Sequence, residues 1–386
     1  MPPSKPPGVY ITEVDSGVRM ITGAGTSTPA FIGSIPGEVR EPRQVQSWNQ
    51  FREIYLPSGD GEDFTASSYA AEAVYGFFAN GGGSCYVVGT ADGDDCLAAY
   101  QGNEDEGTGL AALELVPEVK IIVAPDLWQT AEDAPAIAKA IARHCADLGN
   151  RMAVLHTKQG LSATDAEKVP AAFGLDEEEA QFTSVYYPWV TTPGFDGTER
   201  LIPPSGHIAG VWARTDAQRG VQKAPANQNL QTVTGIEVSL SDDEQGPLNA
   251  AGVNCLRSFP GQGVLVWGAR TLSDSSEWRY LNVRRLANFL RESIRTSTKW
   301  VVFEPNDERL QSAVRASTTS FLMEQWRSGA LLGHTPHEAF YVICDESNNP
   351  PEGIADGKLT IDVGVAAVRP AEFITFRILQ ISGSET

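Results

Sequence analysis

The 386-residue sequence is poor in cysteine and histidine and has no long apolar segment. Its five cysteines are scattered, and none forms the C-x-x-C pair typical of zinc and redox sites. We therefore expect reduced, mostly buried thiols in a protein made in the cytoplasm. No apolar run approaches the roughly 20 residues that a membrane-spanning helix needs. The Pro-rich start over residues 1–7 lacks the apolar core of a secretory signal, so we expect no such signal.

Positive charge is also scarce. Lys and Arg number 29 against 49 Asp and Glu, which gives a formal net charge of −20 at pH 7. Such a surface repels phosphate backbones and anionic membranes, so we predict no nucleic-acid partner and no direct membrane insertion. Most of the excess negative charge lies in residues 1–200. The more balanced second half can be buried against partners at a lower electrostatic cost.

Motifs for catalysis, metals and cofactors are weak or incomplete. The segment Gly353–Leu359 imitates a phosphate-binding loop, but Leu359 stands where a Ser or Thr would bind Mg²⁺. His334 and His337 are three residues apart, but they lie in a predicted loop without a third metal ligand. No G-x-S-x-G segment is present. We predict no catalytic residue, no cofactor and no metal.

One enzymatic alternative stays open. The segment Gly25–Pro29 faintly resembles the serine loop of subtilisin, and Gly206–Gly210 faintly resembles its histidine segment. The chain order is reversed relative to subtilisin, and no aspartate motif accompanies the two segments. A subtilisin-like or other α/β hydrolase is therefore the alternative to a structural protein.

Residues 64–200 have the alternating pattern of an α/β fold. Glycines follow a predicted helix over residues 64–80, and Thr130 is a candidate cap for a second helix ending at Leu148. Short apolar strands lie between such helices, which predicts a mostly parallel sheet with helices on its faces. Residues 203–265 look irregular. The predicted strands are residues 85–88, 119–124, 152–155, 184–187 and 264–267.

Two long helices are predicted near the C-terminus, over residues 280–299 and 307–328, because apolar residues recur there at helical spacing. Strands are predicted over residues 341–344, 359–368 and 372–381. The first helix carries a basic stripe that is either ordinary solvation or a docking face for an acidic partner. The stripe consists of Arg284, Arg291, Arg295 and Lys299.

The two terminal strands have no local partner. Residues 9–14 form an apolar strand pattern that is followed by glycines instead of a hairpin mate, and residues 372–381 end near the last residue. Unpaired strands need neighbours, so each must pair with a distant segment or with another chain.

Eight segments spread over nearly the whole chain fit one pattern in order. They are Pro7–Val14, Thr28–Gly33, Trp48–Tyr55, Phe78–Gly82, Pro203–Asp216, Val221–Asn227, Asn254–Gly261 and Val266–Leu272. Together with the two C-terminal helices they resemble the contractile tail sheath family, the sheath proteins of phage tails and phage-like injection particles. The resemblance implies a structural protein and not an enzyme. A terminator or tube protein of the tail fits less well, because tube proteins are usually shorter and all-β.

The resemblance also implies a fold and a set of domains. We expect a mixed α/β and α+β chain. It would contain a non-catalytic subtilisin-like α/β lobe and a C-terminal core domain whose sheet is completed by the arms of neighbouring subunits. The expected domains are an N-terminal arm over 1–22, the lobe over 23–265 with an acidic outer part at about 90–200, the core over 266–370 and a C-terminal arm over 371–386.

The resemblance implies partners and site residues as well. The chain would assemble with itself in helically stacked six-fold rings around an inner tube protein, with a baseplate and a terminator or cap. It would be assembled in the bacterial cytoplasm as part of a phage tail or injection particle. The expected arm residues are Val9, Tyr10, Ile11, Thr12, Val14, Phe373, Ile374, Phe376, Ile378 and Leu379. The expected tube contacts are Arg284, Arg291, Arg295, Lys299, Arg309 and Arg315.

Overall fold

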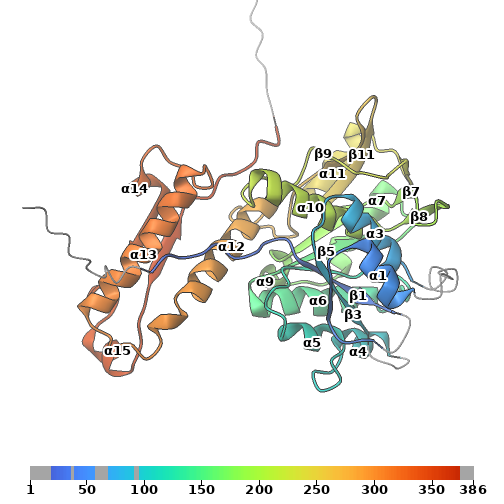
Figure 1. The fold of residues 1–386 in the computed structure, drawn as a ribbon. Coiled ribbons are helices and arrows are strands. Elements are labelled where there is room, and N and C mark those ends of the chain that lie inside the picture. Colours follow the sequence, from blue (N-terminus) through green and yellow to red (C-terminus); the bar gives the residue numbers. More distant parts are fainter. Residues whose placement is uncertain (1–18, 36–38, 57–67, 91–94, 374–386) are drawn as a thin grey trace, which may run out of the picture. The chain divides into compact units, whose positions relative to one another are not determined.

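The computed structural model describes residues 19–35, 39–56, 68–90 and 95–373 (Figure 1). The chain forms two compact units. Unit 1 comprises Met1–Ala24 and Glu292–Ala367, and unit 2 comprises Gly25–Arg291 and Val368–Thr386. The chain passes between them three times, once within helix α12 (Leu281–Ser297). These units divide the chain differently from the domains expected from the resemblance, whose boundaries stay a prediction.

Unit 2 is built on a nine-stranded sheet with the order β2-β3-β1-β4-β5-β6-β11-β12-β9. All pairings from β3 to β11 are parallel, and the pairings at both ends of the sheet are antiparallel. The predicted mostly parallel sheet is thus confirmed. Its strands are β1 (Pro29–Gly33), β2 (Arg43–Val45), β3 (Cys85–Gly89), β4 (Ile121–Val123), β5 (Met152–His156), β6 (Thr183–Tyr187), β9 (Gln228–Asn229), β11 (Val253–Phe259) and β12 (Gly263–Trp267).

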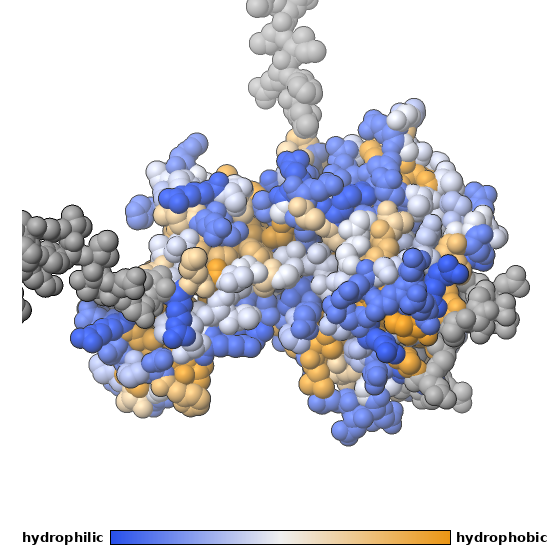
Figure 2. All heavy atoms as spheres, viewed as in Figure 1, coloured by the Kyte–Doolittle hydropathy of each residue, from blue (hydrophilic) through white to orange (hydrophobic). Residues whose placement is uncertain are grey.

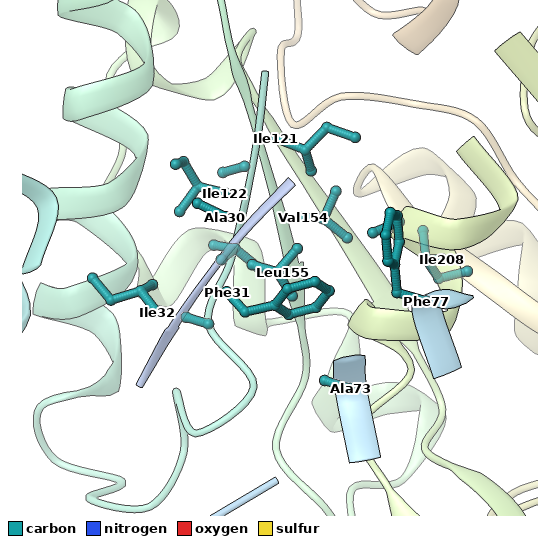
Figure 3. Packing of buried hydrophobic residues seen from close by; sticks show 14 of the residues in the cluster. Ala30, Phe31, Ile32, Ala73, Phe77, Ile121, Ile122, Val154, Leu155 and Ile208 are labelled. Atoms are coloured by element: carbon teal, nitrogen blue, oxygen red, sulfur yellow. The ribbon is translucent and has the colours of Figure 1, made fainter. Parts of the chain in front are cut away.

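The hydrophobic core lies on both faces of this sheet. Side chains along a strand alternate between faces, and Figure 3 shows Phe31, Phe77 and Ile208 on one side of β1 and Ile32 and Ile122 on the other. Phe31 and Phe77 contact each other edge to face, with ring centroids 5.7 Å apart. Strands that are buried on both faces need apolar residues at every position, which explains their continuous apolar runs.

Helices and a small second sheet complete unit 2. The small sheet is antiparallel and consists of β7 (Val190–Pro193), β8 (Glu199–Ile202) and β10 (Gly235–Ile236). The helices are α1 (Trp48–Tyr55), α3 (Ala70–Ala79), α4 (Cys96–Gln101), α5 (Gly109–Glu114), α6 (Ala134–Leu148), α7 (Ala163–Ala166), α8 (Val169–Ala172), α9 (Glu177–Ala180), α10 (Ser205–Arg219) and α11 (Asp242–Ala250).

Helix α10 corrects the prediction of an irregular segment over residues 203–265. Its glycines resemble helix breakers in the sequence, but they let α10 pack directly on α3. A Cβ atom on Gly206 would lie 2.4 Å from the Ala73 carbonyl oxygen, and one on Gly210 would lie 2.5 Å from that of Phe77. Because α10 is buried almost all round over residues 205–213, no polar face marks its helical period.

One further prediction needed correction. Thr130 does not cap α6, because Asp133 occupies the N-cap position there. The central strand β1 follows several glycines and pairs with both β3 and β4, which are distant from it in sequence. Register with neighbours that are distant in sequence determines this strand, and no local pattern carries that information.

Unit 1 contains the second part of α12, helix α13 (Glu308–Arg327) and a two-stranded antiparallel sheet of β13 (Phe340–Ile343) and β14 (Asp362–Val365). The two long C-terminal helices and the strand near residue 341 were predicted, and the structure confirms them. Between them lie the short elements η1 (Lys299–Val301), α14 (Pro336–Ala339) and α15 (Pro351–Ala355). Within the residues that the structure describes, no helix is long and apolar enough to cross a membrane.

Candidate interaction surfaces

The two-stranded sheet of unit 1, which we call the β13–β14 hairpin, exposes apolar side chains on both faces. Paired residues lie on the same face, so Tyr341 and Ile343 share one face while Val363 and Val365 share the other. These four side chains are 58%, 36%, 36% and 37% exposed. Such exposure is unusual for large apolar residues in a sheet and is typical of a surface that a partner covers.

The same hairpin has open edges. Within the described residues, β13 pairs with β14 and with no other strand, so each strand presents a row of backbone groups on its outer side. The face that carries Val363 and Val365 is only partly exposed, since Phe340 and Cys344 on the same face are buried and β13 packs on α13. Gly364 is required opposite Tyr341, because a Cβ atom there would lie 2.1 Å from the tyrosine ring. A sheet of only two strands is marginal by itself, so this one is suited to receive further strands.

The predicted arm residues fall mostly outside the described part of the chain. Val9–Val14 and residues 374–381 are not described, so the predicted terminal strands and their pairing stay predictions. Phe373 is the one predicted arm residue that is described, and it is 79% exposed.

The chain that leads to the N-terminal arm is anchored to α12. In unit 1, the backbone N–H groups of Thr22 and Ala24 donate to Ser297 Oγ and Ser293 Oγ, at 3.1 and 2.9 Å. The Arg19 guanidinium lies over the Trp300 ring, 4.7 Å from its centroid. This segment therefore follows the last two turns of the helix.

In unit 2, the next residues are held by a buried ion pair that the sequence did not reveal. The guanidinium of Arg285 donates to both carboxylate oxygens of Asp216, at 2.9 and 2.5 Å, and to the Thr26 carbonyl oxygen at 3.2 Å. The Thr26 hydroxyl donates to the same carboxylate, and Trp212 packs on the guanidinium. Arg285 differs from its basic neighbours only in what surrounds it after folding, so no sequence signal could have distinguished it.

The chain that leads to the C-terminal arm is anchored in unit 2 as well. Asn282 Nδ2 donates to the Val368 carbonyl oxygen at 2.9 Å. Arg270 forms a two-point ion pair with Glu372 and also donates to the Asn249 carbonyl oxygen at 2.9 Å. The hydrogen bonds that Arg270 donates to Glu372 raise the pKa of Arg270.

The predicted basic stripe does not form one exposed surface. Arg284 is buried between the rings of Phe182 and Trp278, and its guanidinium donates to Gln181 and Asn288. Burial lowers its pKa to about 10. Arg284 is thus a structural residue of unit 2, and its side chain is largely unavailable to a partner.

Of the six basic residues expected to contact the tube, the five other than Arg284 have exposed or half-exposed side chains. Arg295 pairs with Glu292, and Arg315 pairs with Asp345 at 3.1 Å. Arg291, Lys299 and Arg309 are exposed and form no ion pair with any residue that the structure describes. The structure describes no partner for these positions, so contact with a tube stays a proposal.

The enzymatic alternative finds no support in the geometry. His207 is fully buried, its pKa is lowered to about 4 by burial, and Gly76 packs against its ring. Its ring lies near the Thr232 hydroxyl, at 3.5 Å. Within the described chain, no Ser or Cys side chain is hydrogen-bonded to a His, and no cluster of metal-binding side chains occurs.

Parallel α/β sheets usually bind ligands at the carboxyl ends of their strands, and here that end is filled. The indoles of Trp128 and Trp189 donate to the carbonyl oxygens of His156 and Thr157, both at 2.7 Å. Asp126 accepts from the Ser68 hydroxyl and the Tyr69 N–H, both at 2.7 Å, and burial raises its pKa to about 6. Aromatic side chains therefore cover the carboxyl end of β5 (Met152–His156).

Comparison with known proteins identifies the family. The model "Phage tail sheath protein central domain" matches residues 98–272, and "Phage tail sheath C-terminal domain" matches residues 273–381. The sheath of the extracellular contractile injection system PVC, solved in its contracted state, is 30% identical with a TM-score of 0.77, and each chain is covered to 98%. The chain belongs to the phage tail sheath family. This is a structural family and not an enzyme family.

Other sheath proteins agree with this assignment. The helical sheath of the anti-feeding prophage (AFP) in its contracted state is 30% identical with a TM-score of 0.78, covering 98% of this chain and 99% of that one. The tail sheath protein of Vibrio phage KVP40 is 29% identical over 192 residues, which is 49% of this chain and 28% of that protein. The matches span less than half the length of each curated relative.

Proposed function

We propose that this chain is the sheath subunit of a contractile injection particle. It polymerises as stacked six-subunit rings around an inner tube and shortens to drive the tube through a target membrane. The observation that carries this proposal is the match over nearly the full length to two sheaths that were solved in the contracted state. A baseplate is a further proposed partner, because a related chain comes from a structure of the AFP baseplate.

Strand exchange is the proposed means of polymerisation. The open edges and exposed apolar faces of the β13–β14 hairpin support it, since they offer main-chain hydrogen bonds and side-chain contacts to an added strand. The proposed added strands are residues 9–14 and 373–381 of neighbouring subunits. Both arms begin from anchored positions, one near Thr26 and one at Glu372. A tether of this kind lets subunits change their packing without separating.

Contraction needs no bound nucleotide in this proposal. One sequence would support two packings of different free energy, and a trigger would release the subunits from the less stable one. A difference of about 1–3 kcal/mol per subunit, typical of coupling between sites, becomes large when it is summed over a long sheath.

The tube contact is proposed for the exposed basic residues of α12, η1 and α13. Arg284 is left out of the proposed tube contacts because it is buried. The net charge of the chain is −20, so a local basic surface would be selective for an acidic tube. The proposed contacts are Arg291, Arg295, Lys299, Arg309 and Arg315.

Three finer points stay proposals. They are a subtilisin-like, non-catalytic form of the α/β lobe, domain boundaries near residues 22, 265 and 370, and assembly in the bacterial cytoplasm with a terminator or cap. The covered carboxyl edge of the sheet fits a lobe without catalysis, and the free cysteines fit a reducing compartment.

Electron microscopy of the purified full chain in negative stain tests the proposal. We expect hollow helical tubes built of six-fold rings. A variant that lacks residues 1–15 should fold normally but remain unpolymerised, because one exchanged strand is gone. A matched control that lacks residues 382–386, beyond the proposed C-terminal strand, should polymerise like the full chain. Tubes of normal length from the variant without residues 1–15 would overturn strand exchange by the N-terminal arm.

A further inference from the structure

A cavity of about 570 Å³ opens in unit 2 where the described chain ends. It lies between α11, the end of β12 and the last described residues, and its volume is within the range of sites that bury a small ligand. We call it the Trp267 pocket. The residues that matter for the argument are Ala226, Gly246, Asn249, Trp267, Ala371 and Phe373.

Two exposed aromatic residues line the Trp267 pocket, beside charged residues that include Lys223, Asp242 and Arg257. The Trp267 ring packs on Phe259, with ring centroids 4.7 Å apart, yet 38% of Trp267 stays exposed. Phe373 also lines the pocket and is largely exposed. Two large aromatic side chains that face one cavity favour an apolar occupant.

The ion pair between Arg270 and Glu372 holds the end of the described chain beside this pocket. Glu372 is held by Arg270, and Arg270 is itself held by the carbonyl oxygen of Asn249, which lines the pocket. Consecutive Cα atoms are 3.8 Å apart, so Ile374 lies within about 4 Å and Phe376 within about 11 Å of the Phe373 Cα. The following residues thus begin at the rim of the pocket.

The sequence that follows alternates, with Ile374, Phe376 and Ile378 on one side of an extended strand and Thr375, Arg377 and Leu379 on the other. Before assembly, such a strand is an aggregation hazard. A segment tethered next to its site has an effective concentration in the millimolar range, far above that of a second subunit in dilute solution. The occupant that the geometry favours is therefore the segment of the same chain.

We propose that, in a subunit that has not yet assembled, Ile374 and Phe376 occupy the Trp267 pocket of their own chain. The inference rests on the proposed strand exchange, since the same segment must leave the pocket before it joins a neighbour. Docking covers the apolar strand while the subunit is free, and release from the pocket precedes polymerisation. The pocket and the β13–β14 hairpin then compete for one segment.

Thiol labelling of the full-length monomer tests this. In a background with Cys96→Ser, since Cys96 is the one native cysteine that is not buried, a single new cysteine is placed by Ile374→Cys or, for comparison, by Ser384→Cys. Monomer is isolated by size exclusion and checked by sedimentation velocity. If the docked form makes up about nine tenths of the monomer, the thiol at 374 reacts about tenfold more slowly than that at 384.

A second substitution shows whether the Trp267 pocket causes the protection. Gly246→Trp adds a large ring to a residue that lines the pocket, at a position where a Cβ atom meets no atom within 4 Å beyond its chain neighbours. It should abolish the protection at 374 and shorten the lag before polymerisation. The matched control is Ala250→Trp, which adds the same ring to an exposed position of α11 outside the pocket and should leave both rates unchanged.

Three results would overturn the proposal. They are equal labelling at 374 and 384 in the monomer, protection that persists in Gly246→Trp, and protection that grows with protein concentration, which would place a second copy in the pocket. Each is measured on monomer, so it is independent of whether sheath tubes form. Failure of the strand exchange by this segment would appear instead in electron microscopy, as tubes of normal length from a variant that lacks residues 374–386.

Discussion

The sheets of the two units differ in how their edges and faces are covered. In unit 2, helices cover the parallel strands on both faces, and the edge strands β2 and β9 are only three and two residues long. In unit 1, the β13–β14 hairpin keeps both edges open and exposes large apolar side chains on both faces. Very short edges limit pairing with other chains, whereas β13 and β14, at four residues each, combine slightly longer edges with exposed apolar side chains, which invites it. Unit 2 is therefore complete within one chain, while unit 1 presents what another chain can complete.

The largest expected effect tests whether unit 2 is held together internally. Arg285→Ala should lower the free energy of unfolding by about 3–5 kcal/mol, because Asp216 is left as an unpaired buried charge. The side chains of this pair are only 3% and 6% exposed. Urea unfolding followed by tryptophan emission reports mainly on unit 2, which contains Trp48, Trp128, Trp189, Trp212, Trp267 and Trp278.

The control for this prediction is an exposed pair in the same unit. Arg143 and Asp147 lie 3.7 Å apart with side chains 73% and 71% exposed. Arg143→Ala should change the free energy of unfolding by no more than about 1 kcal/mol. Equal effects of the two substitutions would contradict the view that the buried pair stabilises unit 2.

The second effect concerns pH and the filled carboxyl edge of the large sheet. Burial raises the pKa of Asp126 to about 6, above its unfolded value near 4. Between these values the folded state binds more protons than the unfolded state, so stability falls as pH rises from about 4 to 6. The free energy of unfolding should fall by about 3 kcal/mol between pH 4 and 6 in the wild type, and this fall should be absent in Asp126→Asn. Urea unfolding at each pH measures it.

Asp165 supplies the opposite sign as a control. Hydrogen bonds from Lys168 and Ser162 lower the pKa of this exposed carboxyl. Its contribution is present above the unfolded pKa and is lost as pH falls through the folded pKa. Asp165→Asn should therefore leave the pH 4 to 6 window unchanged. A wild-type curve that rises with pH across that window, relative to Asp126→Asn, would refute the role of burial.

The third effect tests the close contact of α3 with α10. Gly210→Val places side-chain atoms against the Phe77 carbonyl oxygen and should destabilise unit 2 by about 1–3 kcal/mol. In Gly246→Ala the new methyl group meets no atom beyond its chain neighbours, and because Pro247 follows it the gain in helix propensity is offset, so the stability of this variant should change by no more than about 0.5 kcal/mol. Thermal unfolding of both variants gives the comparison. An unchanged unfolding temperature for Gly210→Val would show that α3 and α10 can move apart without loss of stability.

The smallest effect on stability is expected in unit 1, together with a large effect on assembly. Tyr341→Ser removes an exposed apolar side chain, so the free energy of unfolding should change by no more than about 0.5 kcal/mol. Tube formation seen by electron microscopy should nevertheless fall sharply, since an added strand loses its cross-strand contact. Val302→Ser changes an exposed apolar residue of the same unit outside the hairpin and serves as the control. Normal tubes from Tyr341→Ser would break the contrast between the units.

The sequence predicted the parts of the fold that local patterns specify. Short apolar runs predict the strands of the parallel sheet, and the helical segments between them include α6. Apolar residues that recur at helical spacing predict α12 and α13. The family resemblance added the assembly function, which no motif carried. Helix α10 was missed because the prolines scattered over residues 203–265 made the whole segment look irregular, whereas Pro204 is in fact the N-cap residue of α10.

The candidate site was predicted less well, because its decisive contacts join distant residues. Arg284 and Arg285 are neighbours in the sequence, yet one lies between Phe182 and Trp278 and the other pairs with Asp216. Helical spacing placed both on a helix but could not show which protein surface each would meet. The open hairpin edge is also a property of pairing, and only the strand order reveals it.

The way the N-terminal segment lies along α12 has a mechanical consequence. Its contacts follow one another along the helix, from Arg19 at Trp300 through Thr22 at Ser297 to Ala24 at Ser293. Tension directed along the helix axis loads all three contacts at once, in shear, because none can break before the others are strained. Tension directed away from the helix peels them open singly, beginning at Arg19. The same attachment is thus strong or weak according to the direction of the pull.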